Sequence, residues 1–309
     1  MSKNINVKYI PNTYSITLTS KYLFDTIIGM RYTFKQFKEE YPDDKACLKA
    51  VLENRFGSTC PKCGVIDTKF YPITGRKAFA CLHCRQHIYP LADTIFRKSE
   101  TSLWNWFYAI YLFSVSKNGV SAKELERHLG VTYKTAWRMC KQIRLLMAQD
   151  IDKLSGDIEI DETYIGGTRK MSQKFSNKTA VFGMVERNGS AMAVKVKSTG
   201  ARVLLPEIQK GAEANSNIFS DEWRSYKSLP KLGYSHTTVN HSQLEYVRGT
   251  AHTNTIEGFW GQLKRSIDGT YHSVSPKYLQ SYVNEFVFRY NLRSVPICPI
   301  LLELAGKRI

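Results

Sequence analysis

Residues 156–167 read Gly-Asp-Ile-Glu-Ile-Asp-Glu-Thr-Tyr-Ile-Gly-Gly, and this stretch decides the fold of the chain. Apolar and acidic residues alternate in it with the period of a β-strand, whose successive side chains point to opposite faces of a sheet. The alternation predicts that Asp157, Glu159 and Asp161 share one face of the strand and that Glu162 lies on the other. The stretch therefore predicts a strand that carries acidic side chains at the edge of a sheet.

Short apolar runs separated by turn signals continue after this strand. Asn188-Gly189 is a hairpin turn signal, and further strands are expected at 179–186, 191–197, 217–219 and 236–239. Helical patterns stand between and after these runs, at 202–214, at 223–229 and from Thr255 onward. The expected order is three strands, a helix, a strand, a short helix, a strand and a final helical region. An RNase H-like α/β fold requires this order. We therefore expect a mixed sheet flanked by helices.

Two more carboxylates occupy positions where such a fold exposes its site. Asp221 directly follows the run at 218–220, at the C-terminal end of a strand, where α/β sheets place their ligands. Glu257 begins a helix with an apolar stripe, and Lys264 shares the neighbouring stripe with it. We therefore expect Asp161, Asp221 and Glu257 to form one catalytic group, and we expect Lys264 to bind a phosphate.

Carboxylates are the ligands that hard divalent cations such as Mg²⁺ or Mn²⁺ prefer. Two such ions activate the attacking oxygen and stabilise the leaving oxygen of a phosphodiester, so no covalent protein nucleophile is required. The alternative, that these acids are ordinary surface residues, stays open. Asn254 lies one helical turn before Glu257 and is a second candidate for the third ligand. Three further acids are candidates to contact the metal ligands without binding the metal themselves: Glu159, Glu162 and Glu222.

The chain of 309 residues carries 44 Lys and Arg against 27 Asp and Glu, a net charge of +17. These basic residues run from Lys3 to Arg308 and do not form one tail, so several surfaces should attract a polyanion. With 43% hydrophobic residues the chain is globular, and it is long enough for about two or three domains. DNA or RNA is the expected partner, although charge alone does not exclude a merely basic soluble protein.

Residues 1–23 lack the apolar run and the cleavage pattern of a signal peptide. No segment approaches the roughly 20 apolar residues that a membrane span needs. We therefore expect an intracellular protein, cytoplasmic and associated with the nucleoid, with no membrane partner. Because thiols stay reduced in that compartment, close cysteine pairs are better explained as metal ligands than as disulfides.

Two C-x-x-C knuckles, Cys60-Pro-Lys-Cys63 and Cys81-Leu-His-Cys84, are separated by residues 64–80. This spacing fits four thiolates around one structural zinc ion. It predicts a zinc ribbon with short strands near 69–71 and 77–80. Whether this module also contacts DNA stays open.

Other residues near or outside the knuckles have less specific signals. His83 and His87 are alternative zinc ligands. The remaining three cysteines lie alone on apolar faces, where we expect them to pack in the core: Cys47, Cys140 and Cys298.

Residues 118–138 have the form of a helix-turn-helix. Ser121 can cap a first helix, with Glu124 completing the capping box. Gly130 makes the turn, and the second helix would present four side chains to a DNA major groove, Thr132, Tyr133, Lys134 and Arg138. Thr132 also caps that helix, and its inward positions would be Val131, Ala136 and Met139 or Ile143. An ordinary helical hairpin between domains remains the alternative.

Changes in the residue pattern along the chain divide it into further segments. Apolar residues recur at helical spacing over 33–56, with a break at Pro42. The aromatic-rich stretch 104–115 is expected to pack in the core and not to form a stacking surface. The expected segments are an N-terminal leader of unassigned role (1–32), a helical lead-in (33–57), the zinc ribbon (58–95), the helix-turn-helix region (99–150), the catalytic domain (155–295) and a C-terminal tail (296–309).

Between residues 33 and 291 the chain resembles the bacterial insertion-sequence DDE transposases of the ISXO-like group, which combine a zinc ribbon, a helix-turn-helix and an RNase H-like catalytic domain. The resemblance rests on six motifs in order. They are Cys60-Pro-Lys-Cys63, Cys81-Leu-His-Cys84, Glu159-Ile-Asp-Glu-Thr-Tyr-Ile-Gly-Gly167, Ser220-Asp-Glu-Trp-Arg-Ser-Tyr226, His252-Thr-Asn-Thr-Ile-Glu-Gly-Phe-Trp260 with Lys264, and Phe286-Val-Phe-Arg-Tyr-Asn291.

The resemblance implies that Asp161, Asp221 and Glu257 are the metal-binding triad and that Lys264 is the lysine seven residues after the third acid. Because some relatives use an asparagine as the third ligand, Asn254 remains a candidate. It also implies a metal-dependent DNA transposase that binds terminal inverted repeats in double-stranded DNA. Such an enzyme exposes a 3′ hydroxyl at each element end, joins it to target DNA and works as a homodimer or higher assembly.

Beside the triad, Lys264 and Arg265 are expected to position the DNA backbone. His252 and His272 are expected either to contact DNA or leaving groups or to be structural. Two rival functions stay open, a DNA-binding regulator derived from a transposase and a structure-selective or RNase H-type nuclease that shares the metal site but performs no strand transfer.

Overall fold

The computed structural model describes residues 32–148, 150–166, 178–239 and 252–307. The described residues form two compact units, one of residues 147–294 and one that combines residues 32–146 with residues 295–307. All of the expected N-terminal leader except residue 32 lies outside the described residues.

The unit of residues 147–294 is built on a five-stranded sheet with the strand order β6-β5-β4-β7-β8. Its central strand, β4 (Asp157–Ile165), pairs antiparallel with β5 (Thr179–Glu186), which pairs antiparallel with β6 (Ala191–Lys195). On the other side β4 pairs in parallel with β7 (Asn217–Ser220), and β7 with β8 (Ser235–Thr238). The sheet is therefore mixed, as the sequence predicted.

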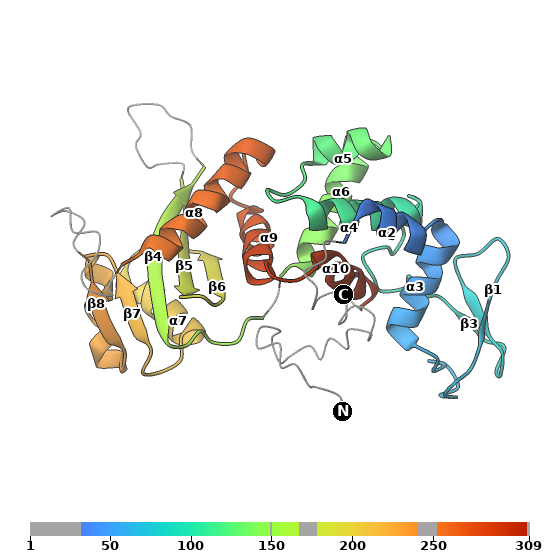
Figure 1. Ribbon diagram of the computed structural model, residues 1–309, viewed down its shortest axis with the longest axis horizontal. Coiled ribbons are helices and arrows are strands. Elements are labelled where there is room, and N and C mark those ends of the chain that lie inside the picture. The colour runs from blue at the N-terminus through green and yellow to red at the C-terminus, as the bar shows by residue number, and fades with distance from the viewer. Residues whose placement is uncertain (1–31, 149, 167–177, 240–251, 308–309) are drawn as a thin grey trace. The chain divides into compact units, whose positions relative to one another are not determined.

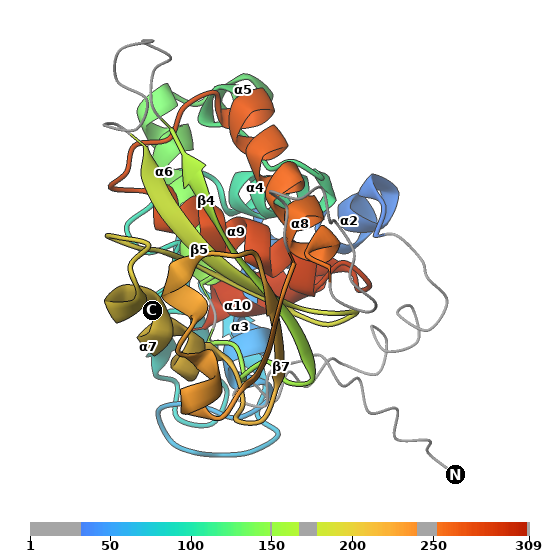
Figure 2. The same ribbon diagram turned by 90° about the vertical axis from the view of Figure 1, so that its left-hand side faces the viewer.

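Helices cover both faces of this sheet (Figures 1 and 2). Helix α7 (Ala201–Gly211) packs on the face to which Ile158 and Ile160 point. The opposite face packs against α8 (Asn254–Ser266) and α9 (Leu279–Asn291) through alternate residues of β5, Val181 and Val185. Strand alternation thus gives the sheet two separate apolar cores.

The predicted order of strands and helices is confirmed in this unit. The short helix expected at 223–229 differs, because the structure has two 3₁₀ helices there, η1 (Arg224–Tyr226) and η2 (Leu229–Leu232). Pro230 stands in the first turn of η2, where it has no N–H to continue a helix from the preceding residues.

Side-chain amides of α9 cover the outer edge of β6. Asn291 accepts a hydrogen bond from the backbone N–H of Ala191 at 2.7 Å and donates one to its carbonyl at 3.0 Å. Gln280 likewise accepts from Lys195 N–H at 2.6 Å and donates to the Ala193 carbonyl at 3.2 Å. Two amides thus replace a neighbouring strand, which protects the edge from pairing with another chain.

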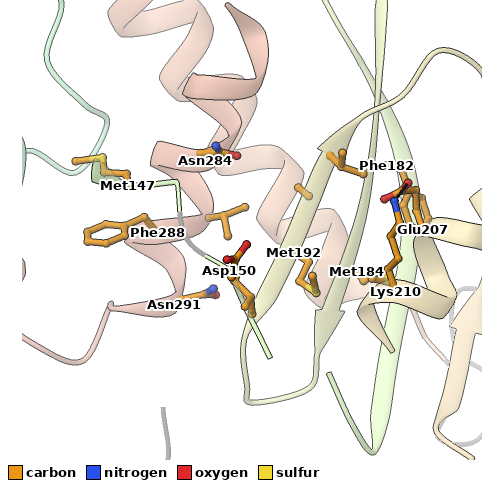
Figure 3. A pocket seen from close by; sticks show the side chains of 14 residues that line it. Met147, Asp150, Phe182, Met184, Met192, Glu207, Lys210, Asn284, Phe288 and Asn291 are labelled. Atoms are coloured by element: carbon orange, nitrogen blue, oxygen red, sulfur yellow. Dashed lines mark hydrogen bonds and ion pairs between the residues drawn. The ribbon is translucent and has the colours of Figure 1, made fainter. Parts of the chain in front are cut away.

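A cavity of about 280 Å³ lies beside this edge, as Figure 3 shows. Its lining is mainly apolar and rich in methionine, with Met147, Met184, Met192 and Phe288 beside Asn291. None of the predicted catalytic residues lines it. The cavity is therefore separate from the acidic residues considered below.

The second unit holds the N-terminal helices, a three-stranded ribbon and the last helix. Its elements are α2 (Phe34–Glu40), α3 (Asp44–Phe56), β1 (Phe70–Pro72), β2 (Phe79–Cys81), β3 (His87–Ile88), α4 (Leu103–Val115), α5 (Ala122–Leu129), α6 (Tyr133–Leu146) and α10 (Ile297–Gly306). The break predicted at Pro42 separates α2 from α3. The aromatic stretch forms α4, whose Trp106, Phe107 and Phe113 are buried as expected.

Helix α10 completes the core of this unit. The sequence indicated only a tail at 296–309, whereas α10 packs against α3, α4 and α6. Asn54 of α3 donates a hydrogen bond to the Leu302 carbonyl at 3.2 Å. The C-terminal segment therefore returns to a core formed some 200 residues earlier. Among the described residues, no helix has the length and apolar character needed to cross a membrane.

The amide cover of β6 predicts a local effect of Asn291→Ala. Loss of both hydrogen bonds should speed amide hydrogen exchange at Ala191 about thirtyfold, because each bond contributes about 1 kcal/mol. Hydrogen exchange followed by mass spectrometry measures this change. Gln262→Ala, at an exposed position of α8, is the control and should leave the rate unchanged. An unchanged rate in Asn291→Ala would show that the amide does not protect the edge.

Candidate active site and metal centre

The first two candidate carboxylates lie at the same level on adjacent strands. Glu159 of β4 is paired with Phe219 of β7 in the parallel register. Asp161 and Asp221 each come two residues after this pair, so both extend from the same edge of the sheet. The strand register therefore brings together two acids that are separated by 60 positions in the chain.

The third carboxylate, Glu257, lies in the first turn of α8 and is exposed. Thr253, just before this helix, donates a hydrogen bond from its hydroxyl to Glu257 Oε1 at 2.9 Å. Helix α8 packs against β4 and β5. The first turn of the helix thus carries Glu257 toward the strand that holds Asp161.

The pKa of Asp161 is raised to about 6, mainly by burial and also by the negative charges of Asp221 and Glu257. The Glu162 backbone and the Trp260 side chain act in the opposite direction. The three acids therefore share one electrostatic environment, in which like charges oppose ionisation. A divalent cation would relieve this repulsion, and an all-carboxylate set is the donor chemistry of Mg²⁺ and Mn²⁺.

Glu159 fixes the helix that carries Glu257. Its carboxylate has no exposed surface and accepts hydrogen bonds from the backbone N–H groups of Thr255 at 2.8 Å and Ile256 at 3.0 Å. It also accepts a bond from the Thr255 hydroxyl at 2.9 Å. A carboxylate at a helix N-terminus satisfies amides that have no partner within the helix and interacts favourably with the helix dipole.

Arg187 compensates the buried charge of Glu159. Its Nε donates to Glu159 Oε1 at 2.8 Å, and its Nη2 donates to the His252 carbonyl at 2.9 Å. The guanidinium also lies 4.1 Å from the centroid of the Phe219 ring. Three segments of the chain, β7, the end of β5 and the approach to α8, therefore meet around one arginine.

The two predicted histidines have partners within the protein. His252 Nδ1 lies 3.1 Å from Glu159 Oε1, and His272 Nδ1 lies 2.9 Å from the Asp268 carbonyl. Because His252 Nδ1 is buried without a hydrogen bond to the described residues, these contacts do not decide between the two roles that the sequence left open. Asn254 is the first residue of α8 and is exposed, as are Lys264 and Arg265 further along the helix.

Trp260 reaches Asp161 because a glycine stands opposite that aspartate. Gly183 of β5 is paired with Asp161, and a Cβ atom there would lie 2.5 Å from the indole of Trp260. The indole is buried and close enough to lower the pKa of Asp161. A side chain at position 183 would therefore displace the ring that lies against the carboxylate.

Glu162 lies on the opposite face of β4, as predicted. Tyr226 of η1 donates a short hydrogen bond from its hydroxyl to Glu162 Oε1. Burial raises the pKa of Glu162 to about 7, and Asp161 and Asp221 raise it in the same direction. Burial, with Glu162 beside it, also raises the pKa of Tyr226 well above its ordinary value. Glu222 is exposed.

The two cysteine knuckles converge in the second unit. Their four sulfur atoms all lie within 4.8 Å of one another, and Cys60 Sγ is 3.9 Å from Cys84 Sγ. Among the described residues no other group of three or more His, Cys, Asp or Glu gathers so closely, the three carboxylates included. His83 and His87 are exposed and outside this group. Four converging sulfurs fit a tetrahedral zinc ion.

The knuckle arrangement depends on local turns and on the ribbon. Gly64 follows the first knuckle with φ +73°, and Arg85 follows the second with φ +57°. Lys62 N–H donates to Cys60 Sγ at 3.4 Å. Strands β1, β2 and β3 form an antiparallel sheet behind the knuckles. The isolated cysteines Cys47, Cys140 and Cys298 are buried, as expected.

Helices α5 and α6 occupy the predicted helix-turn-helix positions. The Ser121 hydroxyl accepts from Glu124 N–H at 3.1 Å, Gly130 ends α5 with φ +63°, and the Thr132 hydroxyl accepts from Thr135 N–H at 3.3 Å. The inward positions Ala136, Met139 and Ile143 are buried.

The four side chains expected to face DNA differ in their surroundings. Thr132, Tyr133 and Lys134 are exposed. Arg138 is half-buried, donates to the Arg97 carbonyl at 3.1 Å and lies over the Trp106 ring. The exposed start of α6 is therefore the part of this helix that is most accessible to a ligand.

Two segments of the chain match known protein families. Residues 153–291 match the ISXO2-like transposase domain, and residues 42–87 match the transposase zinc-ribbon domain. The chain therefore contains an ISXO2-like transposase domain and a transposase zinc-ribbon domain. The first match includes all three carboxylates of the transposase, and the second includes both cysteine knuckles.

Two relatives support this assignment. The transposase is 27% identical over 271 residues to an uncharacterized protein in transposable element ISH50 of Halobacterium salinarum, covering 79% of this chain and 89% of the relative. It is 28% identical over 98 residues to an uncharacterized transposase-like protein of Haemophilus influenzae, covering 32% and 78%. Both relatives are described in terms of transposition.

Among solved structures, a chain in the simian T-cell lymphotropic virus intasome in complex with PP2A regulatory subunit B56 gamma aligns with 58% of the transposase and 66% of its own length. The TM-score is 0.30 and the identity 14%. A likeness this weak carries no argument about the fold.

Several residues of this site in the transposase were not predicted from the sequence. Arg187 follows β5 at the hairpin and has no local signal that links it to Glu159, 28 positions earlier. Gly183 lies inside the strand predicted at 179–186 and was not singled out. Trp260 and Tyr226 lay within quoted motifs, which could have marked them as neighbours of the acids.

The zinc site predicts a loss of metal in Cys84→Ser. Zinc content measured by plasma mass spectrometry should fall from one ion per chain to nearly none, because a structural site needs all four ligands. Cys140→Ser, a buried cysteine outside the knuckles, should retain the zinc. An unchanged zinc content in Cys84→Ser would contradict the four-thiolate site.

Glu159→Gln should destabilise the unit of residues 147–294 by about 3–5 kcal/mol, since it leaves Arg187 and the amides of α8 without their charged acceptor. Urea denaturation measures the change as a lower midpoint at an unchanged slope. The matched control is Glu207→Gln, which breaks a surface pair with Lys210 and should cost less than about 1 kcal/mol. A similarly small loss of unfolding free energy in both variants would show that Glu159 does not anchor α8.

The raised pKa of Asp161 predicts a pH dependence in protein that retains zinc but has no other divalent ion. The folded chain holds this proton more tightly than the unfolded chain, whose aspartate has a pKa of 3.8. The resulting stability is complete below about pH 4 and is lost as the pH rises through about 6. Asp161→Asn lacks this loss, so its stability relative to wild type should rise by up to about 3 kcal/mol between pH 4 and pH 7.5. Denaturation curves at both pH values test this, and a constant difference between the proteins would contradict it.

Proposed function

We propose that this transposase catalyses movement of an insertion sequence through Asp161, Asp221 and Glu257. The observation that carries the proposal is the electrostatic grouping of these acids, in which Asp221 and Glu257 both raise the pKa of Asp161. Such a concentration of negative charge within a chain of net charge +17 suits a site that binds cations and receives a polyanion.

We also propose that the sheet is of the RNase H-like type. Its strand order places the first strand in the centre, with the second and third on one side and the fourth and fifth on the other. The first three strands are antiparallel, and the last two are parallel to the first. This topology supports an active site at the edge where β4 and β7 carry their acids.

Asp161, Asp221 and Glu257 would hold two Mg²⁺ or Mn²⁺ ions, with exposed Asn254 as the alternative third ligand. When bound, the ions supply activation of the attacking oxygen and stabilisation of the leaving oxygen in phosphodiester chemistry. Glu159 and Arg187 keep α8 in place, and buried Trp260 excludes water from one side of Asp161. Lys264 and Arg265, exposed on the same helix, would position the DNA backbone.

The second unit is proposed to recognise DNA. The exposed start of α6, with Thr132, Tyr133 and Lys134, has the accessibility that a helix in a major groove requires. Arg138 donates one guanidinium N–H to the Arg97 carbonyl, and its other N–H groups would contact DNA. The zinc ion would keep the two knuckles together. On this basis the substrate is double-stranded DNA at the terminal inverted repeats.

The full reaction that we propose has two chemical steps. Hydrolysis at each element end exposes a 3′ hydroxyl, and that hydroxyl then attacks a phosphodiester of target DNA. Both steps replace one oxygen at phosphorus by another, so the same carboxylates serve each of them. A homodimer or higher assembly would hold the two ends together during joining.

Strand transfer by the purified transposase tests this proposal. The substrate is labelled DNA from both flanks of its own gene, with Mn²⁺ or Mg²⁺, and Asp221→Ala is the control. Joined products should form with the wild type and be undetectable with the variant, because the variant lacks a ligand at the end of β7. Cleavage without joining would favour the nuclease, and DNA binding without cleavage would favour the regulator.

A further inference from the structure

Beside the acidic edge of the sheet, the unit of residues 147–294 exposes two aromatic side chains. Trp223 is 49% exposed and Tyr164 is 41% exposed, and the third large apolar side chain exposed in the described part of this unit is Leu232. Trp223 comes two residues after Asp221, and Tyr164 three residues after Asp161. The two exposed rings therefore belong to the segments that carry the first two acids.

Both rings are tied to the same residue, Thr199, which stands just before α7. Trp223 donates from its indole Nε1 to the Thr199 carbonyl at 3.0 Å, and Tyr164 Oη lies 3.4 Å from Thr199 Oγ1. Ser225 donates to the same carbonyl at 2.8 Å. Because the polar atom of the indole is bonded inside the protein, its exposed part is the apolar ring surface.

The backbone of Trp223 is also linked to the acidic site. Its N–H donates to Asp221 Oδ1 at 3.0 Å. The indole is thus fixed at one end by the carboxylate segment and at the other by Thr199, so it is held in place before any ligand arrives. A preorganised aromatic ring loses little conformational freedom on binding.

The charges near these rings suit an anionic ligand. Lys197 and Arg202 are exposed within three residues of Thr199, and Arg224 is exposed next to Trp223. Glu222 and the half-buried Asp221 are the acids of this stretch, so cations are in excess by one. An aromatic ring between cations matches the chemistry of a nucleotide, whose base stacks while its phosphates bind the cations.

We propose that Trp223, supported by Tyr164, stacks an unpaired nucleobase of the DNA strand whose phosphate lies at Asp161 and Asp221. A base within a duplex is already covered on both faces, so the base bound here must have left the helix. This inference rests on the proposed function for its substrate, DNA, and assigns to this surface the recognition of an opened element end.

The test compares Trp223→Phe with Trp223→Leu. Both variants lose the indole hydrogen bond to Thr199, but only phenylalanine keeps an aromatic face. Binding in Ca²⁺ is measured with two element-end DNAs, one fully paired and one with unpaired bases next to the cleavage site. Leu232→Ala, another exposed apolar residue of the unit, is the control.

The wild type, Trp223→Phe and Leu232→Ala should prefer the unpaired DNA. Trp223→Leu should bind that DNA roughly ten- to a hundredfold more weakly, as expected for loss of one stacked base, and should bind paired DNA as the wild type does. Equal binding by the Phe and Leu variants would overturn the inference. A wild type that prefers unpaired DNA but never joins strands would contradict the proposed function and leave this inference intact.

Discussion

A carboxylate with no exposure to water, Glu159, holds the candidate site together. Burying a charge is costly unless it is paired and hydrogen-bonded, and Glu159 meets this condition with Arg187 and the first amides of α8. The same contacts determine where α8 begins, and so where Glu257 stands relative to β4. The position of the third acid is thus a consequence of a buried ion pair on the strand that carries the first.

Acidic and basic residues have separate tasks in this chain. The excess of basic residues is spread over the sequence, while Asp221 and Glu257 help to raise the pKa of Asp161, and Asp161 and Asp221 help to raise that of Glu162. Repulsion among these acids destabilises the metal-free protein. A bound divalent cation would relieve this repulsion, which would strengthen its binding. The match of residues 153–291 to the ISXO2-like transposase domain gives this arrangement its chemical context.

Local patterns in the sequence predicted most of the fold. Alternation along residues 157–165 placed Asp161 and Glu162 on opposite faces, and the capping residues Ser121 and Thr132 marked two helices. The two knuckles gave the zinc ligands because their spacing is itself the signal. Contacts between distant segments had no such signal. Glu159 was expected only as a supporting acid, its pairing with Arg187 was not expected, and the return of 297–306 to α3 and α4 was read as a tail.

Asp161, Asp221 and Glu257 are proposed to bind the same metal ions. Localised cleavage by Fe²⁺ tests this proposal most directly, because iron in the place of Mg²⁺ generates radicals that cut the polypeptide near its ligands. With zinc retained, peroxide and ascorbate should cut the chain near residues 161, 221 and 257, and added Mg²⁺ should suppress all three cuts together. Cuts at one of these segments alone, or cuts that Mg²⁺ does not suppress, would contradict a shared site.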